Sequence, residues 1–209
     1  MIIRKTFLFI VFNILVFNLL GQGSNSTKDW QSLFDGKTLN GWKASEKTKA
    51  FVVSNGIIIA SGGRSHLYYI GSVANAKFEN FELKVDVLTE PGTNSGIFIH
   101  TDFQEEGWPK TGYEVQINNS HEDSQKTGGL FNISAIDFPL VNDLEWFNLH
   151  IIVKNKNVIV KINDLIVTNY TETEPEMPIS IFSNGTIALQ AHSEGSVCYF
   201  KNIRIKLLE

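Results

Sequence analysis

Apolar and polar residues alternate with a period of two along most of this chain. Between residues 78 and 87, Phe81, Leu83, Val85 and Val87 fall on one side, and the residues between them are charged. Such alternation is typical of a β-strand with one buried face. The same strand character recurs at residues 51–60, 97–101, 113–118, 147–154, 157–167, 185–191 and 197–207.

Turn-forming residues separate these segments. The dipeptide Asn55-Gly56 interrupts the first of them and is a strong signal for a β-hairpin. Gly, Asn, Asp and Pro mark further turns at residues 91–92, 128–129, 155–157, 163–164 and 184–185. After residue 20, no segment has apolar residues at a helical period over ten or more positions. We therefore predict one all-β domain over residues 33–209, a two-sheet antiparallel β-sandwich of the jelly-roll kind, with a barrel as the variant of similar strand spacing.

The first residues have the organisation of a secretory leader. Arg4 and Lys5 precede an apolar run at residues 7–20, and small and polar residues follow it. This order predicts a signal peptide over residues 1–22 and then a flexible segment over residues 23–32. A retained membrane anchor is the alternative, but the run is shorter than the roughly 20 residues that a span requires. No cysteine follows the run, which argues against a lipid anchor.

Cysteine content and net charge indicate where the protein acts and which partners it is expected to lack. Cys198 is the only cysteine, so the domain contains no internal disulfide. Export without disulfides indicates a bacterial protein of the periplasm or the extracellular space. The net charge of −4 argues against a nucleic-acid partner, which needs clustered Lys and Arg. No phosphate-binding loop, dinucleotide fingerprint or nucleophile elbow is present, and we expect no cofactor, no membrane insertion after removal of the leader and no protein partner.

A set of motifs in a fixed order resembles one known family, the 3-keto-disaccharide hydrolase domain family. The motifs are FDGKTLNGW at residues 34–42, FELKVD at 81–86, NSGIF at 94–98, GYEVQI at 112–117, TGGLF at 127–131, EWFN at 145–148, GTIALQAH at 185–192 and FKNIRIK at 200–206. They cover nearly all of residues 30–208, with residues 64–70 the least typical part. The resemblance implies a concanavalin-like jelly roll, export in bacteria and cleavage of the glycosidic bond of a sugar oxidised at C3.

Three of the predicted strands carry polar residues on the face opposite their apolar residues. Alternation places Glu114, Gln116 and Asn118 on one such face, because successive strand side chains point to opposite sides. By the same alternation, the other two strands contribute Phe98 with His100, and Gln190 with His192. We expect these faces to form one concave carbohydrate-binding surface, although a solvated sheet face without function would show the same pattern.

Roles for these residues follow from the chemistry that the resemblance implies. We predict Glu114, His100 and His192 as catalytic residues. We predict Gln116, Gln190, Phe98, Asn118 and the loop residue Trp108 as substrate-binding residues. A ketone at C3 acidifies the hydrogen on C2, so a base, either Glu114 or His192, can start an elimination. His100 and Gln190 would polarise the ketone, and the acid and base roles of His100 and His192 can be exchanged.

Three alternatives stay open at this level. The first is a non-catalytic, lectin-like carbohydrate-binding module, because jelly rolls host both kinds of protein. The second is an adhesive or structural surface domain. The third concerns a divalent metal: His100, Glu114, His121 and His192 offer ligand atoms, but their spacing is not diagnostic of a metal site. His121 is interpreted as a surface residue, and His66 and His150 as weaker candidates still.

Overall fold

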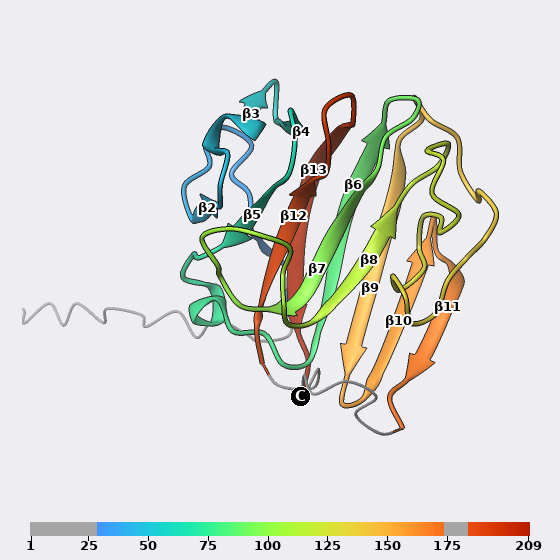
Figure 1. The fold of residues 1–209 in the computed structure, drawn as a ribbon. Coiled ribbons are helices and arrows are strands. Elements are labelled where there is room, and N and C mark those ends of the chain that lie inside the picture. Colours follow the sequence, from blue (N-terminus) through green and yellow to red (C-terminus); the bar gives the residue numbers. More distant parts are fainter. Residues whose placement is uncertain (1–28, 174–183) are drawn as a thin grey trace, which may run out of the picture.

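The computed structural model describes residues 29–173 and 184–209, and its strands form two antiparallel sheets packed face to face (Figure 1). The predicted two-sheet antiparallel sandwich is confirmed. The predicted signal peptide at residues 1–22 lies outside the described residues. Of the predicted flexible segment, residues 31–32 pair with the last strand of the chain, so ordered structure begins before residue 33.

The larger sheet has eight strands in the order β11-β10-β9-β6-β13-β4-β3, with β1 paired to β13. Its strands are β1 (Gln31–Ser32), β3 (Phe51–Ser54), β4 (Ile57–Ser61), β6 (Phe81–Thr89), β9 (Phe147–Lys154), β10 (Asn157–Ile162), β11 (Leu165–Thr171) and β13 (Val197–Leu207).

The smaller sheet has five strands in the order β2-β5-β12-β7-β8. They are β2 (Trp42–Ala44), β5 (Ser65–Tyr69), β7 (Ser95–Thr101), β8 (Tyr113–Ile117) and β12 (Thr186–Ala191). Each sheet includes neighbours that are far apart in sequence, such as β6 beside β13 in the larger sheet and β12 between β5 and β7 in the smaller. Strands from both halves of the chain therefore build each layer.

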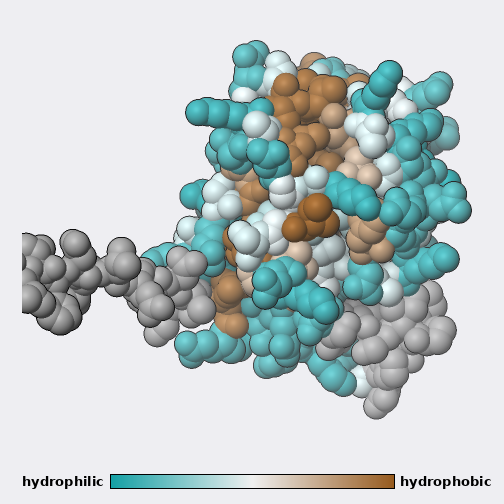
Figure 2. All heavy atoms as spheres, turned by 90° about the vertical axis from the view of Figure 1, so that its left-hand side faces the viewer, coloured by the Kyte–Doolittle hydropathy of each residue, from teal (hydrophilic) through white to brown (hydrophobic). Residues whose placement is uncertain are grey.

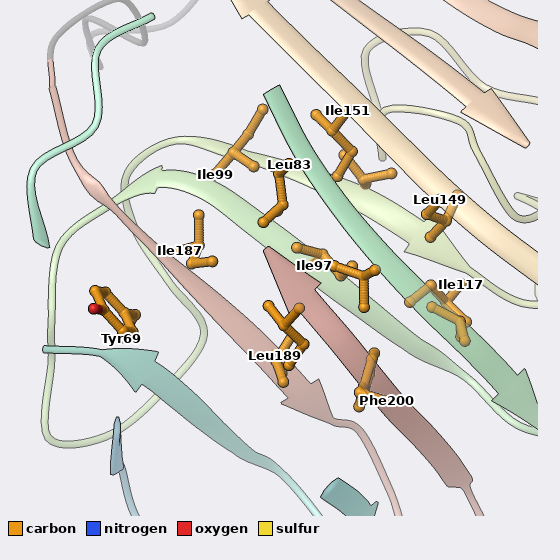
Figure 3. Close-up of a cluster of buried hydrophobic side chains, with 14 of the residues drawn as sticks. Tyr69, Leu83, Ile97, Ile99, Ile117, Leu149, Ile151, Ile187, Leu189 and Phe200 are labelled. Atoms are coloured by element: carbon orange, nitrogen blue, oxygen red, sulfur yellow. The ribbon is translucent and has the colours of Figure 1, made fainter. Parts of the chain in front are cut away.

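The hydrophobic core fills the space between the two sheets (Figure 3). Ile97, Ile99 and Ile117 enter it from the smaller sheet, and Leu83 and Leu149 face them from the larger one; all five are fully buried. Their regular alternation along each strand is the pattern that was read from the sequence. Because these side chains occupy the inner face, the residues between them on β7, β8 and β12 face outward, and this outer face carries the candidate site.

The structure adds three strands that the alternation pattern does not predict. They are β1, β2 and β5, and two short 3-10 helices at Thr48–Ala50 and Val73–Ala76 accompany them. All five residues of β5 are buried, so its two faces do not differ in polarity along the sequence. The predicted segment 157–167 is a hairpin, because Asn163 and Asp164 adopt positive φ angles of 47° and 67° between β10 and β11.

The edge formed by β2, β3 and β5 is mostly hydrophilic at its surface, with one apolar area in its upper part (Figure 2). In this region of the chain Val52 and Ile70 are half exposed, at 49% and 50%. Among the residues that the structure describes, no helix has the length and apolarity needed to cross a membrane.

Candidate active site

A pocket of about 620 Å³ lies on the outer face of the smaller sheet. Its size falls in the range of small-molecule sites. The residues that line it come from β7, β8, the end of β12 and the loops that follow β7 and β8: Asn94, Phe98, Trp108, Pro109, Lys110, Gly112, Tyr113, Glu114, Gln116, Asp123, Phe131, Asn132, Ile133, Gln190 and His192. Six of the residues proposed from the sequence are therefore brought together: Phe98, Trp108, Glu114, Gln116, Gln190 and His192.

Strand pairing explains how these side chains meet. Across β7 and β8, Phe98 pairs with Glu114 and Gly96 pairs with Gln116. Across β5 and β12, Gln190 pairs with His66. Side chains that are paired across strands stand side by side on the same face of a sheet. Gly96 has no side chain, and the Glu114 side chain occupies the place above it at the floor of the pocket.

Glu114 reaches across this floor to Gln190. Its Oε1 accepts a hydrogen bond of 2.7 Å from Gln190 Nε2. Desolvation by burial is the main cause that raises the pKa of Glu114 to about 7, and the negative charge of Asp123 adds to the effect; the hydrogen bond from Gln190 opposes it. A carboxyl group with this pKa exchanges a proton readily near neutral pH, as a general base or acid must.

Gln116 and Asn94 form the polar wall beside this carboxyl group. Gln116 Nε2 donates a hydrogen bond of 3.1 Å to Asn94 Oδ1. The Asn94 backbone in turn is held by Ser196, whose Oγ accepts from Asn94 N at 3.1 Å. Both side chains are almost completely buried. Their amide groups are fixed in place and can offer hydrogen bonds to a hydroxylated ligand.

His192 comes directly after β12 and lines the same pocket. Its ring centroid is 5.1 Å from that of Trp108 and 6.1 Å from that of His121. Burial lowers the pKa of His192, and the nearby His121 lowers it further, whereas Asp123 acts in the opposite direction. The imidazole is therefore neutral at pH 7 and can both donate and accept one hydrogen bond. Trp108 is 43% exposed and presents a ring face at the mouth of the pocket.

Asp123 is a second carboxylate at the pocket, and sequence reasoning did not include it. It lies in the loop after β8, which is held by hydrogen bonds to backbone carbonyls. Lys126 Nζ donates to the carbonyl oxygens of His121 and Asp123 at 2.6 and 2.7 Å. Asn118 Nδ2 donates to the carbonyl oxygen of Asp123 at 2.9 Å and to that of Gln125 at 2.8 Å.

This network corrects the prediction for Asn118. The side chain was expected to face the substrate, but it is fully buried and engaged with the loop. The alternation of β8 ends at Ile117, so a strand pattern no longer fixes the direction of the next residue. Asn118 acts on the site indirectly, by holding the loop that carries Asp123.

His100 also lies elsewhere than expected. Ile187 pairs with Ile99 and Thr186 with Thr101, so His100 is the extra residue of a β-bulge and has a φ of 53°. Its Nε2 lies 2.9 Å from the carbonyl oxygen of Glu79, and its ring packs edge-on against Phe81 at 5.7 Å. A bulge reverses the alternation of the strand. The prediction that His100 shares the pocket with Glu114 is therefore wrong.

Two further polar residues lie beside the pocket on β5, which was not recognised as a strand: His66 was interpreted only as a weak candidate, and Tyr68 was not considered. His66 and Tyr68 lie on the same outer face, and both are fully buried. The His66 ring packs against Phe98 and Trp108 at 5.3 and 5.6 Å. Desolvation lowers the pKa of His66 to about 4, so its ring is neutral. Within residues 29–173 and 184–209, no group of three or more His, Cys, Asp or Glu side chains could hold a metal ion.

Comparison with known sequences gives one family. The family described as the 3-keto-alpha-glucoside-1,2-lyase-like domain matches residues 29–206. A 3-keto-disaccharide hydrolase of Bacteroides thetaiotaomicron is 25% identical over 229 aligned positions, which cover 85% of this chain and 78% of that protein.

Solved structures share the fold. A Parabacteroides distasonis protein, provisionally assigned as a glycosyl hydrolase, superposes with a TM-score of 0.71 at 24% identity and covers 86% of this chain and 94% of its own. The carbohydrate-binding module CBM66 of Bacillus subtilis has a TM-score of 0.58 at 16% identity, over 79% of this chain and 95% of its own. The fold is thus common to a provisionally assigned hydrolase and to a binding module, and the site has to distinguish the two activities.

Proposed function

Because the chain belongs to the 3-keto-alpha-glucoside-1,2-lyase-like domain family, we propose that it cleaves the glycosidic bond of 3-keto-glycosides by elimination. One observation carries this proposal: the Glu114 carboxyl group lies desolvated at the floor of a sugar-sized pocket, with one oxygen held at 2.7 Å by Gln190. A non-catalytic module does not require a carboxyl group whose pKa is raised to about 7.

Glu114 is the base in this proposal. Its unprotonated form removes the hydrogen from C2 of the bound sugar, which the neighbouring C3 ketone has acidified. The electron pair of the C–H bond forms the enolate. It then forms the C1–C2 double bond as the bond from C1 to the glycosidic oxygen breaks. The departing oxygen takes up a proton, and the product is an unsaturated 3-keto sugar to which water can add.

The surrounding side chains serve the other steps. Hydrogen-bond donors near an enolate oxygen stabilise the negative charge that develops there. We assign this role to the amide groups of Gln116 and Asn94, which lie beside the Glu114 carboxyl group. His192, whose ring is neutral, can donate a hydrogen bond to the departing oxygen, which takes up its proton from the Glu114 carboxylic acid that the first step forms. Trp108 offers a ring face to the C–H side of a pyranose.

Direct hydrolysis is the second candidate, and Asp123 is the observation that favours it. Glycosidases that act on unmodified sugars use two carboxyl groups on either side of the scissile bond. Glu114 and Asp123 both line the pocket, and the negative charge of Asp123 helps to raise the pKa of Glu114. In this case the C2 hydrogen would stay in place throughout the reaction.

A single substrate separates these possibilities. The protein is incubated with 4-nitrophenyl 3-keto-glucoside carrying deuterium at C2, and with 4-nitrophenyl glucoside. Elimination predicts release of nitrophenol from the first only, with loss of deuterium from the sugar product. Full retention of deuterium would reject elimination in favour of hydrolysis. Binding of the keto sugar without release from either substrate would instead support a carbohydrate-binding module.

We also propose that the protein acts outside the cytoplasm. A leader at residues 1–22 would send the domain to the periplasm or the extracellular space of a bacterium, where glycosides enter the cell envelope. The proposed partner is the carbohydrate alone, without a metal or organic cofactor.

A further inference from the structure

Buried polar atoms without a hydrogen-bond partner gather on one side of the pocket. Among the described residues they include both ring nitrogens of His66, the hydroxyl of Tyr68, Oε1 of Gln190 and Nδ1 of His192. All four side chains belong to β5, to β12 or to the residue that follows β12. Native proteins leave few buried polar atoms unpaired, and a cluster of them needs an explanation.

The enclosure of His66 and Tyr68 is aromatic. Phe98 and Trp108 pack against the His66 ring at 5.3 and 5.6 Å, and Phe103 packs against the Tyr68 ring at 5.1 Å. These aromatic rings pack against the His66 and Tyr68 rings but give them no hydrogen bonds in place of those that water would have given. A neutral imidazole has one N–H group and one lone pair, and the Tyr68 hydroxyl both donates and accepts. The site therefore has the polarity of a hydroxyl-binding surface with apolar walls.

Trp108 separates this cluster from the open pocket, because it lines the pocket and also covers His66. It belongs to the loop between β7 and β8. Gln104 holds this loop together from within: its Nε2 donates to the carbonyl oxygens of Glu106 and Trp108, and its Oε1 accepts from Lys110 N. The loop can thus move as one body.

Contacts at the surface hold the loop against the sheet. Gly107 N donates to Glu46 Oε1 at 2.9 Å, and Lys43 pairs with Glu105 at 3.1 Å. Exposed contacts of this kind contribute little to stability. Displacement of this loop would uncover His66 and Tyr68 beside the pocket that holds Glu114.

We infer that the outer face of β5 under Trp108 is a second sugar subsite, which binds the pyranose ring of the leaving group. A pyranose presents hydroxyl groups at its rim and C–H groups on its faces. The hydroxyl groups can hydrogen-bond to His66, Tyr68 and Gln190, and the C–H faces can pack against Phe98 and Trp108. Gln190 lies between this subsite and Glu114, because it pairs with His66 across β5 and β12 and donates a hydrogen bond to Glu114. The inference rests on the proposed function, because it assigns the two ends of the pocket to the two rings of one substrate.

Two variants test the subsite: Tyr68→Phe removes only the hydroxyl, and His66→Phe removes both ring nitrogens and keeps an aromatic ring, although a larger one. The control is Tyr199→Phe, which removes a hydroxyl bonded to Glu90 at 2.9 Å on the larger sheet. The full chain is assayed with a 3-keto-disaccharide of two glucopyranose rings and with 4-nitrophenyl 3-keto-glucoside. The measured quantity is the ratio of kcat/KM for the disaccharide to that for the nitrophenyl glycoside.

We expect each variant to lower this ratio about tenfold, the effect of one lost hydrogen bond, and Tyr199→Phe to leave it unchanged. In the unliganded protein the melting temperature of Tyr68→Phe should stay the same or rise, because an unsatisfied buried polar group is removed. In His66→Phe the larger ring opposes this gain. A ratio within twofold of the wild-type value would overturn the subsite. A fall in melting temperature together with an unchanged ratio would show that His66 and Tyr68 serve packing alone.

Failure of the proposed function would give a different result. If the wild-type protein cleaves neither substrate, elimination is rejected, and the subsite is decided by binding. D-glucose is then titrated against the full chain while the His66 ring signals are followed by NMR. Shifts that saturate in the wild-type protein and weaken in Tyr68→Phe support the subsite. Signals that do not move at tens of millimolar glucose would exclude it.

Discussion

The Glu114 side chain lies directly over Gly96 of the neighbouring strand. A Cβ atom at position 96 would lie 2.9 Å from Glu114 Cγ and would also collide with Oε1. The absence of a side chain at this one position allows the carboxyl group to cross β7 and reach Gln190 on β12. The position of the proposed base thus depends on a glycine that makes no contact of its own with a ligand.

Gly96→Ala should therefore displace Glu114 and break its bond to Gln190. We expect kcat to fall on the order of 10²-fold, within the range for loss of a positioned general base, with little change in KM. The double variant with Glu114→Gln provides the control. If Gly96 acts only through Glu114, Gly96→Ala adds no further loss to Glu114→Gln. Independent, multiplicative losses would contradict this relationship.

The pKa of Glu114 predicts the pH dependence of activity. The base must be unprotonated, so kcat/KM should rise with pH and level off above about 7. Glu114→Gln should reduce the rate by about 10² to 10⁴ and abolish this step. Rates measured between pH 5 and pH 9 give the midpoint. A flat profile with full wild-type activity at pH 5 would exclude Glu114 as the base.

The same raised pKa has a consequence for stability. The folded protein holds the Glu114 proton more tightly than the unfolded chain, so stability falls as pH rises from the ordinary glutamate pKa toward about 7. Glu114→Gln removes this loss. The variant should gain about 3 kcal/mol relative to wild type at pH 8 compared with pH 4, since each unit of pKa difference is worth about 1.4 kcal/mol. Denaturant unfolding at the two pH values measures the difference, and an equal effect at both would contradict the assignment.

His100 should affect the fold but not the chemistry. Asn tolerates the positive φ of 53° at this position but cannot reproduce the contact with the Glu79 carbonyl or the packing on Phe81. We expect His100→Asn to lower stability by about 1 to 2 kcal/mol and to keep kcat within twofold. Thermal unfolding and turnover of the same preparation provide the comparison. A loss of activity similar to that of Glu114→Gln would show that His100 takes part in catalysis after all.

Asn118 should act through the loop that carries Asp123. Asn118→Ala removes two hydrogen bonds to buried carbonyl groups and should cost about 2 kcal/mol of stability. It should also raise KM more than it lowers kcat, because the loop shapes the pocket. Steady-state kinetics test this, with Asn142→Ala as the control: its side chain has only a long 3.4 Å contact with Glu145. A pure loss of kcat would instead indicate direct contact with the reacting atoms.

The leader prediction has its own measurement. Protein recovered from the exported fraction should have a mass that lacks residues 1–22, because a positively charged start and a short apolar run precede small residues. Intact-mass spectrometry gives the answer directly. A mass that includes these residues would indicate a retained anchor.

The sequence by itself determined the layered β architecture and most of the polar pocket. Period-two alternation depends only on the local geometry of a strand, so Glu114, Gln116 and Gln190 could be assigned to an outward face before their neighbours were known. The motif order then indicated the family. These inferences share one property: neither requires knowing which strands pair with one another.

The tertiary structure decided the features that depend on pairing between distant strands. The bulge at His100 arises from its register with β12, and the crossing of Glu114 over Gly96 arises from the order β8-β7-β12. Strand β5 escaped the pattern because both of its faces are covered, one by the core and the other by the loop with Trp108. Alternation in a sequence marks a strand only when one face is buried and the other is exposed to solvent. Since β5 has no exposed face, only the folded structure reveals that His66 and Tyr68 lie beside the pocket.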